Sequence, residues 1–218
     1  MAQTFKPVAN TLAKVSIVIA VLAPAAVMFA ASTVTRSSYN TKVDVPLDQP
    51  VPFSHQHHVE ELGIDCRYCH STVERSATAG VPTTQTCMAC HSQIWTDSPL
   101  LEPVRLSYKD GTPIKWTLVN SVPDFVFFNH SIHVAKGVGC NVCHGAVNKM
   151  MITSKGVAFQ MSWCLNCHRN PEQFLRPRDQ VFNMNYVTPT DQLELGKKLV
   201  RENRVKKEQL TDCSVCHR

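Results

Sequence analysis

The pentapeptide Cys140-Asn141-Val142-Cys143-His144 decides how the rest of this sequence is interpreted. It is one of five copies of a single pattern, C-x-x-C-H. The other copies are Cys66-Arg67-Tyr68-Cys69-His70, Cys87-Met88-Ala89-Cys90-His91, Cys164-Leu165-Asn166-Cys167-His168 and Cys213-Ser214-Val215-Cys216-His217. Together the five copies use every one of the 10 cysteines in the chain.

This pattern is typical of covalent haem attachment. Two residues between the cysteines let both sulfurs reach one edge of a porphyrin, and the adjacent histidine is then held under the iron as its proximal ligand. The sequence therefore predicts five c-type haems. The attachment residues would be Cys66, Cys69, Cys87, Cys90, Cys140, Cys143, Cys164, Cys167, Cys213 and Cys216, and the proximal ligands His70, His91, His144, His168 and His217.

Zinc binding and disulfide bonds are the alternatives to haem at these cysteines. Zinc takes four ligands from paired C-x-x-C units, and that arrangement does not require a histidine after each pair. A disulfide within each pair would also give the histidine no role. The histidine that follows all five pairs therefore favours haem.

A second pattern, F-x-H-x-x-H, begins at Phe53 and again at Phe128. Each copy precedes two C-x-x-C-H sites, and the second copy follows the first after 75 residues, which indicates a repeated two-haem unit. Histidines three positions apart lie one helical turn apart on one face, so each can reach a different iron. The predicted distal ligands of four haems are His55, His58, His130 and His133, whereas His57 matches neither copy.

The fifth iron needs a distal ligand from elsewhere. Phe182-Asn183-Met184 repeats the pattern of Phe128-Asn129-His130 with methionine in place of histidine. A thioether from Met184 would give one His/Met haem, whose potential is higher than that of a bis-histidine haem. The alternatives for this position are Met150, Met151, Met161 and His57.

The chain is short for five haems. Its 218 residues leave about 44 residues per predicted haem, too few for a conventional hydrophobic core. We expect the haems to form the core, inside a mostly irregular and α-helical chain that is stapled by thioethers and iron ligands. The net charge of +5 comes without a stripe of basic and aromatic residues, so nucleic-acid binding is not indicated.

The N-terminal region predicts a transmembrane anchor over residues 1–35. Residues 15–35 carry no charge, and as a helix they would span about 30 Å, the thickness of a bilayer core. A cleaved secretory signal would look similar, but the weak small-residue cleavage pattern favours a retained anchor. Lys6 and Lys14 favour a cytoplasmic N-terminus, which places the haem region on the periplasmic side of the inner membrane.

The remaining chain divides by composition. Three prolines predict an extended linker over residues 36–52, followed by a pentahaem domain over residues 53–218. Within that domain we expect units at about 53–98, 128–175 and 180–218. Two alternating apolar stretches flank Asp110-Gly111 and predict a small β-hairpin. A basic helix is predicted over about 191–208.

The order of F-x-H-x-x-H followed by two C-x-x-C-H sites resembles the small multihaem cytochromes of the c3/c7 type. This resemblance implies a c3/c7-like fold built from repeated haem-binding units. It also implies that His55 faces the haem of His70 and that His130 faces the haem of His144. His58 and His133 would each reach a different haem.

A closer resemblance covers most of the chain. The N-terminal anchor and the five sites are similar to the pentahaem cytochrome c subunit of alternative complex III, a membrane quinol:electron-acceptor oxidoreductase. So are the stretches Pro123-Asp124-Phe125-Val126-Phe127-Phe128-Asn129-His130, Met161-Ser162-Trp163-Cys164 and His168-Arg169-Asn170-Pro171-Glu172. The resemblance implies three kinds of partner: an iron–sulfur subunit related to molybdopterin enzymes, polytopic membrane subunits that hold the quinol site, and a monohaem cytochrome c.

Iron that is ligated from both sides has no open position for a substrate, and closely spaced haems pass single electrons. We therefore expect a non-catalytic subunit that relays electrons from a quinol-oxidising membrane complex to a periplasmic acceptor. The alternatives are an anchored multihaem quinol dehydrogenase that oxidises quinol itself and a multihaem nitrite reductase. The sequence has no C-x-x-C-K site, and its histidines nearly saturate five irons, which favours the relay.

Mass spectrometry of the mature protein is expected to show five covalently added haems, because each C-x-x-C-H copy would form two thioethers. A mature chain that lacks them would contradict the haem interpretation. A spectrum in which most irons are high-spin would retain the haems but contradict ligation from both sides.

Overall fold

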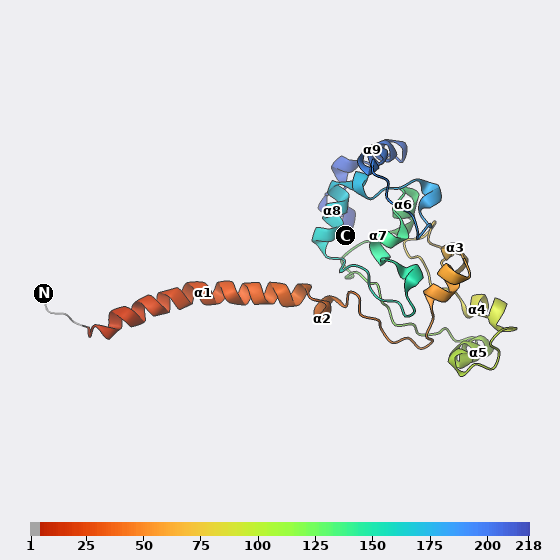
Figure 1. Cartoon of the computed structure of the whole chain (residues 1–218), viewed down its shortest axis with the longest axis horizontal. Helices are drawn as coiled ribbons and strands as arrows, with labels where there is room; N and C mark the ends of the chain where they lie inside the picture. Colours follow the sequence, from red (N-terminus) through yellow and green to blue (C-terminus); the bar gives the residue numbers. More distant parts are fainter. Residues whose placement is uncertain (1–4) are drawn as a thin grey trace. The chain divides into compact units, whose positions relative to one another are not determined.

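The computed structural model describes residues 5–218. The chain divides into two compact units, Met1–Lys42 and Val43–Arg218 (Figure 1). The first four residues of the predicted anchor lie outside the described residues.

The first unit consists of one long helix and one short helical turn. Helix α1 (Val8–Arg36) has 29 residues and is long and apolar enough to cross a membrane, a test that a signal sequence also passes. It continues through Pro24, and none of its residues is buried in the structure. The hydroxyl of Thr33 donates to the Ala30 carbonyl at 2.8 Å, so this polar side chain leaves no unpaired donor.

The segment after α1 is only partly extended. Helix α2 (Ser38–Thr41) forms one turn inside the predicted linker and is capped by Lys42, which has a left-handed backbone. No proline occurs in this turn, whereas Pro46, Pro50 and Pro52 occupy the irregular chain that follows. The prolines thus coincide with the part of the segment that does not form a helix.

The second unit consists of short helices and turns, and residues 5–218 contain no β-strand. Its α-helices are α3 (Cys66–Cys69), α4 (Thr84–His91), α5 (Glu102–Asp110), α6 (His130–Ala135), α7 (Cys140–His144), α8 (Met161–Arg169), α9 (Gln192–Glu202) and α10 (Cys213–Cys216). Its other turns are the π-helix η1 (Gln56–Glu61) and the 3-10 turns η2 (Pro99–Leu101), η3 (Val147–Lys149), η4 (Pro171–Gln173), η5 (Arg178–Gln180) and η6 (Lys207–Gln209). This confirms the predicted fold class, mostly irregular and α-helical.

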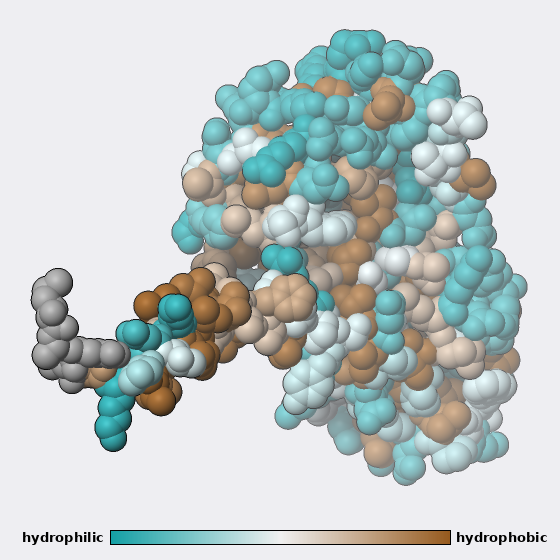
Figure 2. Space-filling view, turned by 60° about the vertical axis from the view of Figure 1, so that its left-hand side comes forward, coloured by the Kyte–Doolittle hydropathy of each residue, from teal (hydrophilic) through white to brown (hydrophobic). Residues whose placement is uncertain are grey.

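The apolar core of the polypeptide is small. The buried hydrophobic side chains are Val51, Val73, Val104, Leu175, Val181 and Leu199. Many larger apolar side chains are exposed, and hydrophobic residues are interspersed with hydrophilic ones on the face seen in Figure 2. Because so few side chains bury apolar surface, the chain lacks the continuous core that stabilises an ordinary domain.

Arg176 is a buried charge that connects several segments. Its guanidinium donates to the Asn141 side-chain oxygen at 2.6 Å and to the Asn183 carbonyl at 3.1 Å. The same group lies 4.6 Å from the ring centre of Tyr186. A side chain at Gly139 would overlap the guanidinium, so glycine permits this approach. Arg176 therefore joins the third C-x-x-C-H site to the loop around residue 183.

The predicted β-hairpin is wrong. Residues 104–108 belong to α5, which begins with Pro103 in its first turn and ends before Gly111, whose φ of 67° forms a left-handed cap. Val104 and Ser107 are buried at helical spacing, whereas Leu106 and Tyr108 are half exposed. The alternation of apolar residues was therefore a poor guide, because the buried face follows a period of three to four residues.

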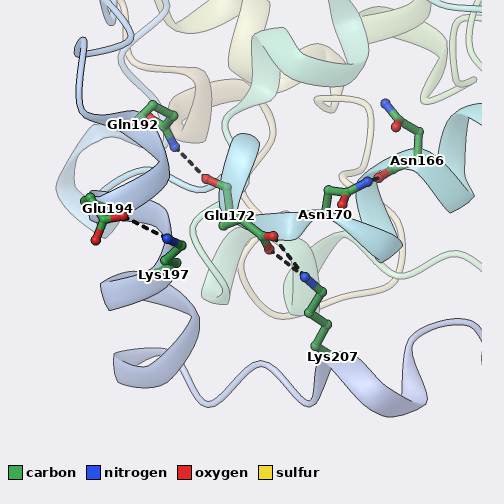
Figure 3. Close-up of polar contacts among 7 residues, drawn as sticks. All are labelled: Asn166, Asn170, Glu172, Gln192, Glu194, Lys197 and Lys207. Carbon is green, nitrogen blue, oxygen red and sulfur yellow. Dashed lines mark hydrogen bonds and ion pairs between the residues drawn. The ribbon is translucent and has the colours of Figure 1, made fainter.

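The predicted helix at 191–208 is shorter than expected. Helix α9 ends at Glu202, and the backbone at Arg204 has a φ of 51°, which a helix cannot adopt. Helix α9 packs on η4, where the Gln192 amide donates to the Glu172 carbonyl at 3.0 Å (Figure 3). Lys207 forms an ion pair of 2.9 Å with the Glu172 carboxylate. Part of the predicted basic face is therefore neutralised within the chain.

We predict that Gly196→Ala destabilises the second unit by about 1–3 kcal/mol, because the new methyl would overlap the Glu172 carbonyl oxygen. Helix propensity alone predicts the opposite sign, a gain of up to about 1 kcal/mol. Denaturant unfolding of the holoprotein measures the difference, with Lys198→Ala on the exposed face of α9 as the control. A stabilised Gly196→Ala variant would contradict the packing of α9 against η4.

Candidate haem sites

Each C-x-x-C pair lies on one helical turn. Helices α3, α7 and α10 consist of little more than the motif, and the pairs at Cys87 and Cys164 lie within α4 and α8. Cysteines three positions apart on a helix share a face, which presents both sulfurs to one porphyrin edge. We number these sites one to five in sequence order.

The arrangement of the cysteines does not fit the alternatives to haem. All ten are free thiols in this structure, as attachment of haem to each pair requires. Zinc would gather four ligands, but residues 5–218 contain no group of three or more cysteine, histidine or acidic side chains that could hold a metal ion. The pairs instead stand apart, one on each helical turn.

The two F-x-H-x-x-H copies have the same geometry. Phe53 lies edge-on to His55 at 4.9 Å and stacks on His58 at 4.4 Å, and Phe128 contacts His130 and His133 in the same way at 4.8 and 4.5 Å. The phenyl ring thus fixes both imidazoles in each copy. His55 and His58 lie on or beside η1, and the other two histidines lie on α6.

Three distal histidines lie opposite proximal histidines. Their ring centres are separated by 6.2 Å for His58 and His91, 6.2 Å for His130 and His144, and 6.3 Å for His133 and His168. A metal–imidazole bond is about 2.0–2.1 Å long and the ring centre lies about 1.2 Å behind the nitrogen, so two rings on one metal have centres about 6.4 Å apart. The three spacings therefore fit one iron between each pair.

His55 lies near the first site. Burial, followed by the neighbouring imidazoles of His70, His58 and His144, lowers the pKa of His55 to about 4. Burial also lowers the pKa of His144 to about 4, and nearby His130 and His70 contribute. Both imidazoles are therefore neutral at physiological pH, the form that can ligate a metal.

Seven of the histidines are oriented by backbone carbonyls. Each Nδ1–H donates to a carbonyl oxygen, because a carbonyl can only accept, and this leaves Nε2 free for iron. The pairs are His58 with Ser54 at 2.8 Å, His70 with Gly80 at 2.7 Å, His91 with Ile94 at 3.2 Å, His130 with Ala77 at 2.8 Å, His133 with Asn129 at 2.7 Å, His168 with Leu210 at 2.9 Å and His217 with Phe125 at 3.1 Å.

His57 has different partners from its neighbours. Its Nδ1 lies 2.8 Å from a carboxylate oxygen of Glu61, and its ring stacks on Trp95 with centres 6.4 Å apart. No proximal histidine lies opposite its ring among the described residues. These contacts give His57 a local role beside the second site.

The fifth site differs from the other four. The ring of His217 stacks on Phe125 at 5.9 Å, and no histidine lies opposite it in residues 5–218. Met184 lines a pocket of about 210 Å³ that is also lined by Cys66, Ile64 and Phe182. The structure thus places Met184 beside the first site, and its ligation of the fifth iron stays a prediction.

An unpaired buried group supplies a further test of whether haem fits. Nε of Arg176 is buried and has no hydrogen-bond partner in the structure. Arg176 also contacts Asn141 within the third motif, so a haem carboxylate near this site would satisfy the free donor. The paired imidazoles, the shared face of each cysteine pair and this donor fit haem. Haem would supply one-electron redox chemistry there, while the chain fixes its ligands and surroundings.

A short helical chain with five such sites and imidazoles on both sides of three of them defines a multihaem c-type cytochrome. Residues 51–99 and 126–218 match the family described as cytochrome c7 and related cytochrome c, which covers more than half of the chain. The protein belongs to this family and carries five c-type haems.

A similar characterised protein is the menaquinone reductase multiheme cytochrome c subunit of Nitratidesulfovibrio vulgaris. The two sequences are 40% identical over 98 residues, which is 44% of this chain and 46% of the relative. This chain therefore matches about half the length of that protein.

Sequence reasoning missed the residues that hold the ligands in place. No local motif reveals Arg176 or the seven carbonyl acceptors. Every residue type has the same backbone carbonyl, and a single arginine forms no repeating pattern in the sequence. The one available signal was the placement of Gly137 and Gly139 immediately before the third site. Glycine there indicates a close approach by another segment. A side chain at Gly137 would overlap the Arg176 backbone, and one at Gly139 would overlap its guanidinium.

We predict that His58→Ala converts about one fifth of the haem to a five-coordinate, high-spin form, because the iron above His91 loses its second imidazole. His57→Ala is the matched control and should leave every haem low-spin, because His57 bonds Glu61 instead. Electron paramagnetic resonance of the oxidised holoprotein measures the spin states. High-spin haem in the His57 variant, together with only low-spin haem in the His58 variant, would reverse the two assignments.

Proposed function

We propose that this protein is a membrane-anchored pentahaem cytochrome that relays electrons between a quinone-linked membrane complex and a redox partner on the periplasmic side. The observation that carries the proposal is the set of three imidazole pairs with ring centres 6.2–6.3 Å apart. Ligation from both sides leaves no position for a substrate, so the residues of the chain serve to bind, orient and insulate redox centres.

The N-terminal helix supports the anchor. None of the residues of α1 is buried within the structure, and its length and composition suit a bilayer. Lys6 and Lys14 favour a cytoplasmic N-terminus. Proteins with c-type haem are extracytoplasmic, so residues 43–218 would lie on the periplasmic side of the inner membrane.

Two observations support a quinone-linked complex. The relative from N. vulgaris is a subunit of a menaquinone reductase. The motifs also resemble the pentahaem subunit of alternative complex III, which supports the quinol-oxidising direction. In that complex the partners would be the iron–sulfur subunit, the polytopic quinol-site subunits and the monohaem cytochrome c. Transfer of electrons toward menaquinone is the second candidate, and the name of the relative favours it.

We predict that a quinol analogue reduces the haems in the complex extracted under mild detergent but not in the isolated chain, because the quinone site would belong to partner subunits. Visible absorbance of the reduced haems measures both reactions, with dithionite as the control for full reduction. Reduction of the isolated chain would favour an anchored quinol dehydrogenase. Reoxidation of the reduced complex by a menaquinone analogue, without reduction by quinol, would favour the reductase direction.

A further inference from the structure

We infer that the five haem sites form one unbranched row in the order second, first, third, fourth, fifth. The second and fifth sites are then the two ends at which electrons enter and leave. If the sites followed one another in space in their sequence order, the first site would instead lie at one end of the row. The order rests on the segments that adjacent sites share.

The first and second sites share η1. His58 on this π-helix lies opposite His91 of the second site. His55 directly precedes η1, and its imidazole interacts with that of His70 in the first site. The two imidazoles are one turn apart, so the irons that they ligate must be neighbours.

The third and fourth sites share α6 in the same way. His130 lies opposite His144 of the third site, and His133 lies opposite His168 of the fourth. Both histidines project from one turn of a six-residue helix. These two irons are therefore also neighbours.

The first and third sites are joined by the loop after α3. Gly80 in this loop accepts from the proximal His70, and Ala77 accepts both the backbone N–H and the Nδ1–H of His130, at 3.0 and 2.8 Å. The Cys66 and Cys140 side chains also lie close enough that each shifts the pKa of the other. One short loop thus orients a ligand of each site and links the two pairs.

The fourth and fifth sites are joined twice. Leu210, three residues before Cys213, accepts from His168. Phe125 accepts from His217, and the N–H of Phe127 donates to the Cys216 carbonyl at 2.6 Å. Residue 127 directly precedes Phe128, the ring that stacks on His133 of the fourth site.

Exposure of the cysteines agrees independently with this order. Cys90 of the second site and Cys213 of the fifth are exposed, whereas the other eight cysteines are partly buried. An unbranched row has two ends, and the exposed cysteines lie at the two sites that the junctions place there. The third site, with Cys140 and Cys143, is the middle of the row.

The assignment of the ends as exchange points rests on the proposed relay function, but the order of the sites does not. A donor or acceptor at any other site would meet a haem with neighbours on both sides. Electrons that cross the protein would pass all five sites, because each interior site has one neighbour on either side.

The test is the position of the five irons in the full-length holoprotein, located by anomalous scattering at the iron absorption edge. We expect the iron of His91 to have one close neighbour, the iron of His70, and the iron of His144 to lie between those of His70 and His168. The order would be overturned if the iron of His91 lay closest to any iron other than that of His70. It would also be overturned if any iron had three close neighbours. Neither outcome depends on quinol reactivity, so failure of the order and failure of the proposed function are distinguishable.

A solution measurement gives a second test with matched variants. His58→Met at an end site and His130→Met at the middle site each raise the potential of one haem, which is then reduced before its bis-histidine neighbours. Reduction to the diamagnetic ferrous state removes spin coupling from one neighbouring paramagnetic resonance signal in the His58 variant and from two in the His130 variant. Equal numbers in the two variants would overturn the row, and variants that do not fold leave the iron positions to decide.

Discussion

The structure depends on pairs of imidazoles that face each other across the space of one iron. Each pair joins residues that are 14 to 35 positions apart in the sequence, such as His130 with His144 and His133 with His168. An iron ligated by each pair would restrict the unfolded chain, as a disulfide does, and only six apolar side chains of residues 5–218 are buried. Ligation and thioether attachment would thus replace the hydrophobic core, which explains how a chain of short helices could hold one conformation.

The backbone determines where those imidazoles point. A carbonyl fixes the Nδ1–H of five of those six imidazoles, and in some cases that carbonyl belongs to a segment of the neighbouring site: Ala77 holds His130, and Leu210 holds His168. One site therefore cannot shift without moving a ligand of the next. Arg176 adds a similar link through Asn141. The orientation of the ligands and the spacing of the sites are consequently set by the same hydrogen bonds.

Local spacing was the part of this protein that the sequence could predict. The i, i+3 cysteines and the F-x-H-x-x-H pairs lie on helical turns because three residues make nearly one turn. Long-range placement was not accessible. Phe182-Asn183-Met184 reproduces even the asparagine turn of Asn129, since Asn183 accepts from the N–H of Asn185, yet it packs beside Cys66. The apolar alternation at residues 104–108 failed for a related reason, because packing against α4 buries Val104 and Ser107 and selects a helix.

The gradient of burial along the row has a physical consequence for electron transfer. Removal of water disfavours the more charged state of any group, as the lowered pKa of His144 shows at the third site. The oxidised state of a haem carries one more positive charge than the reduced state, so the more buried middle of the proposed row would favour reduction more than its ends. Cys90 and Cys213 are exposed at the two end sites, where partners would approach, whereas the cysteines of the three interior sites are partly buried. The same fold that compensates for a missing core therefore also grades the environment along the row.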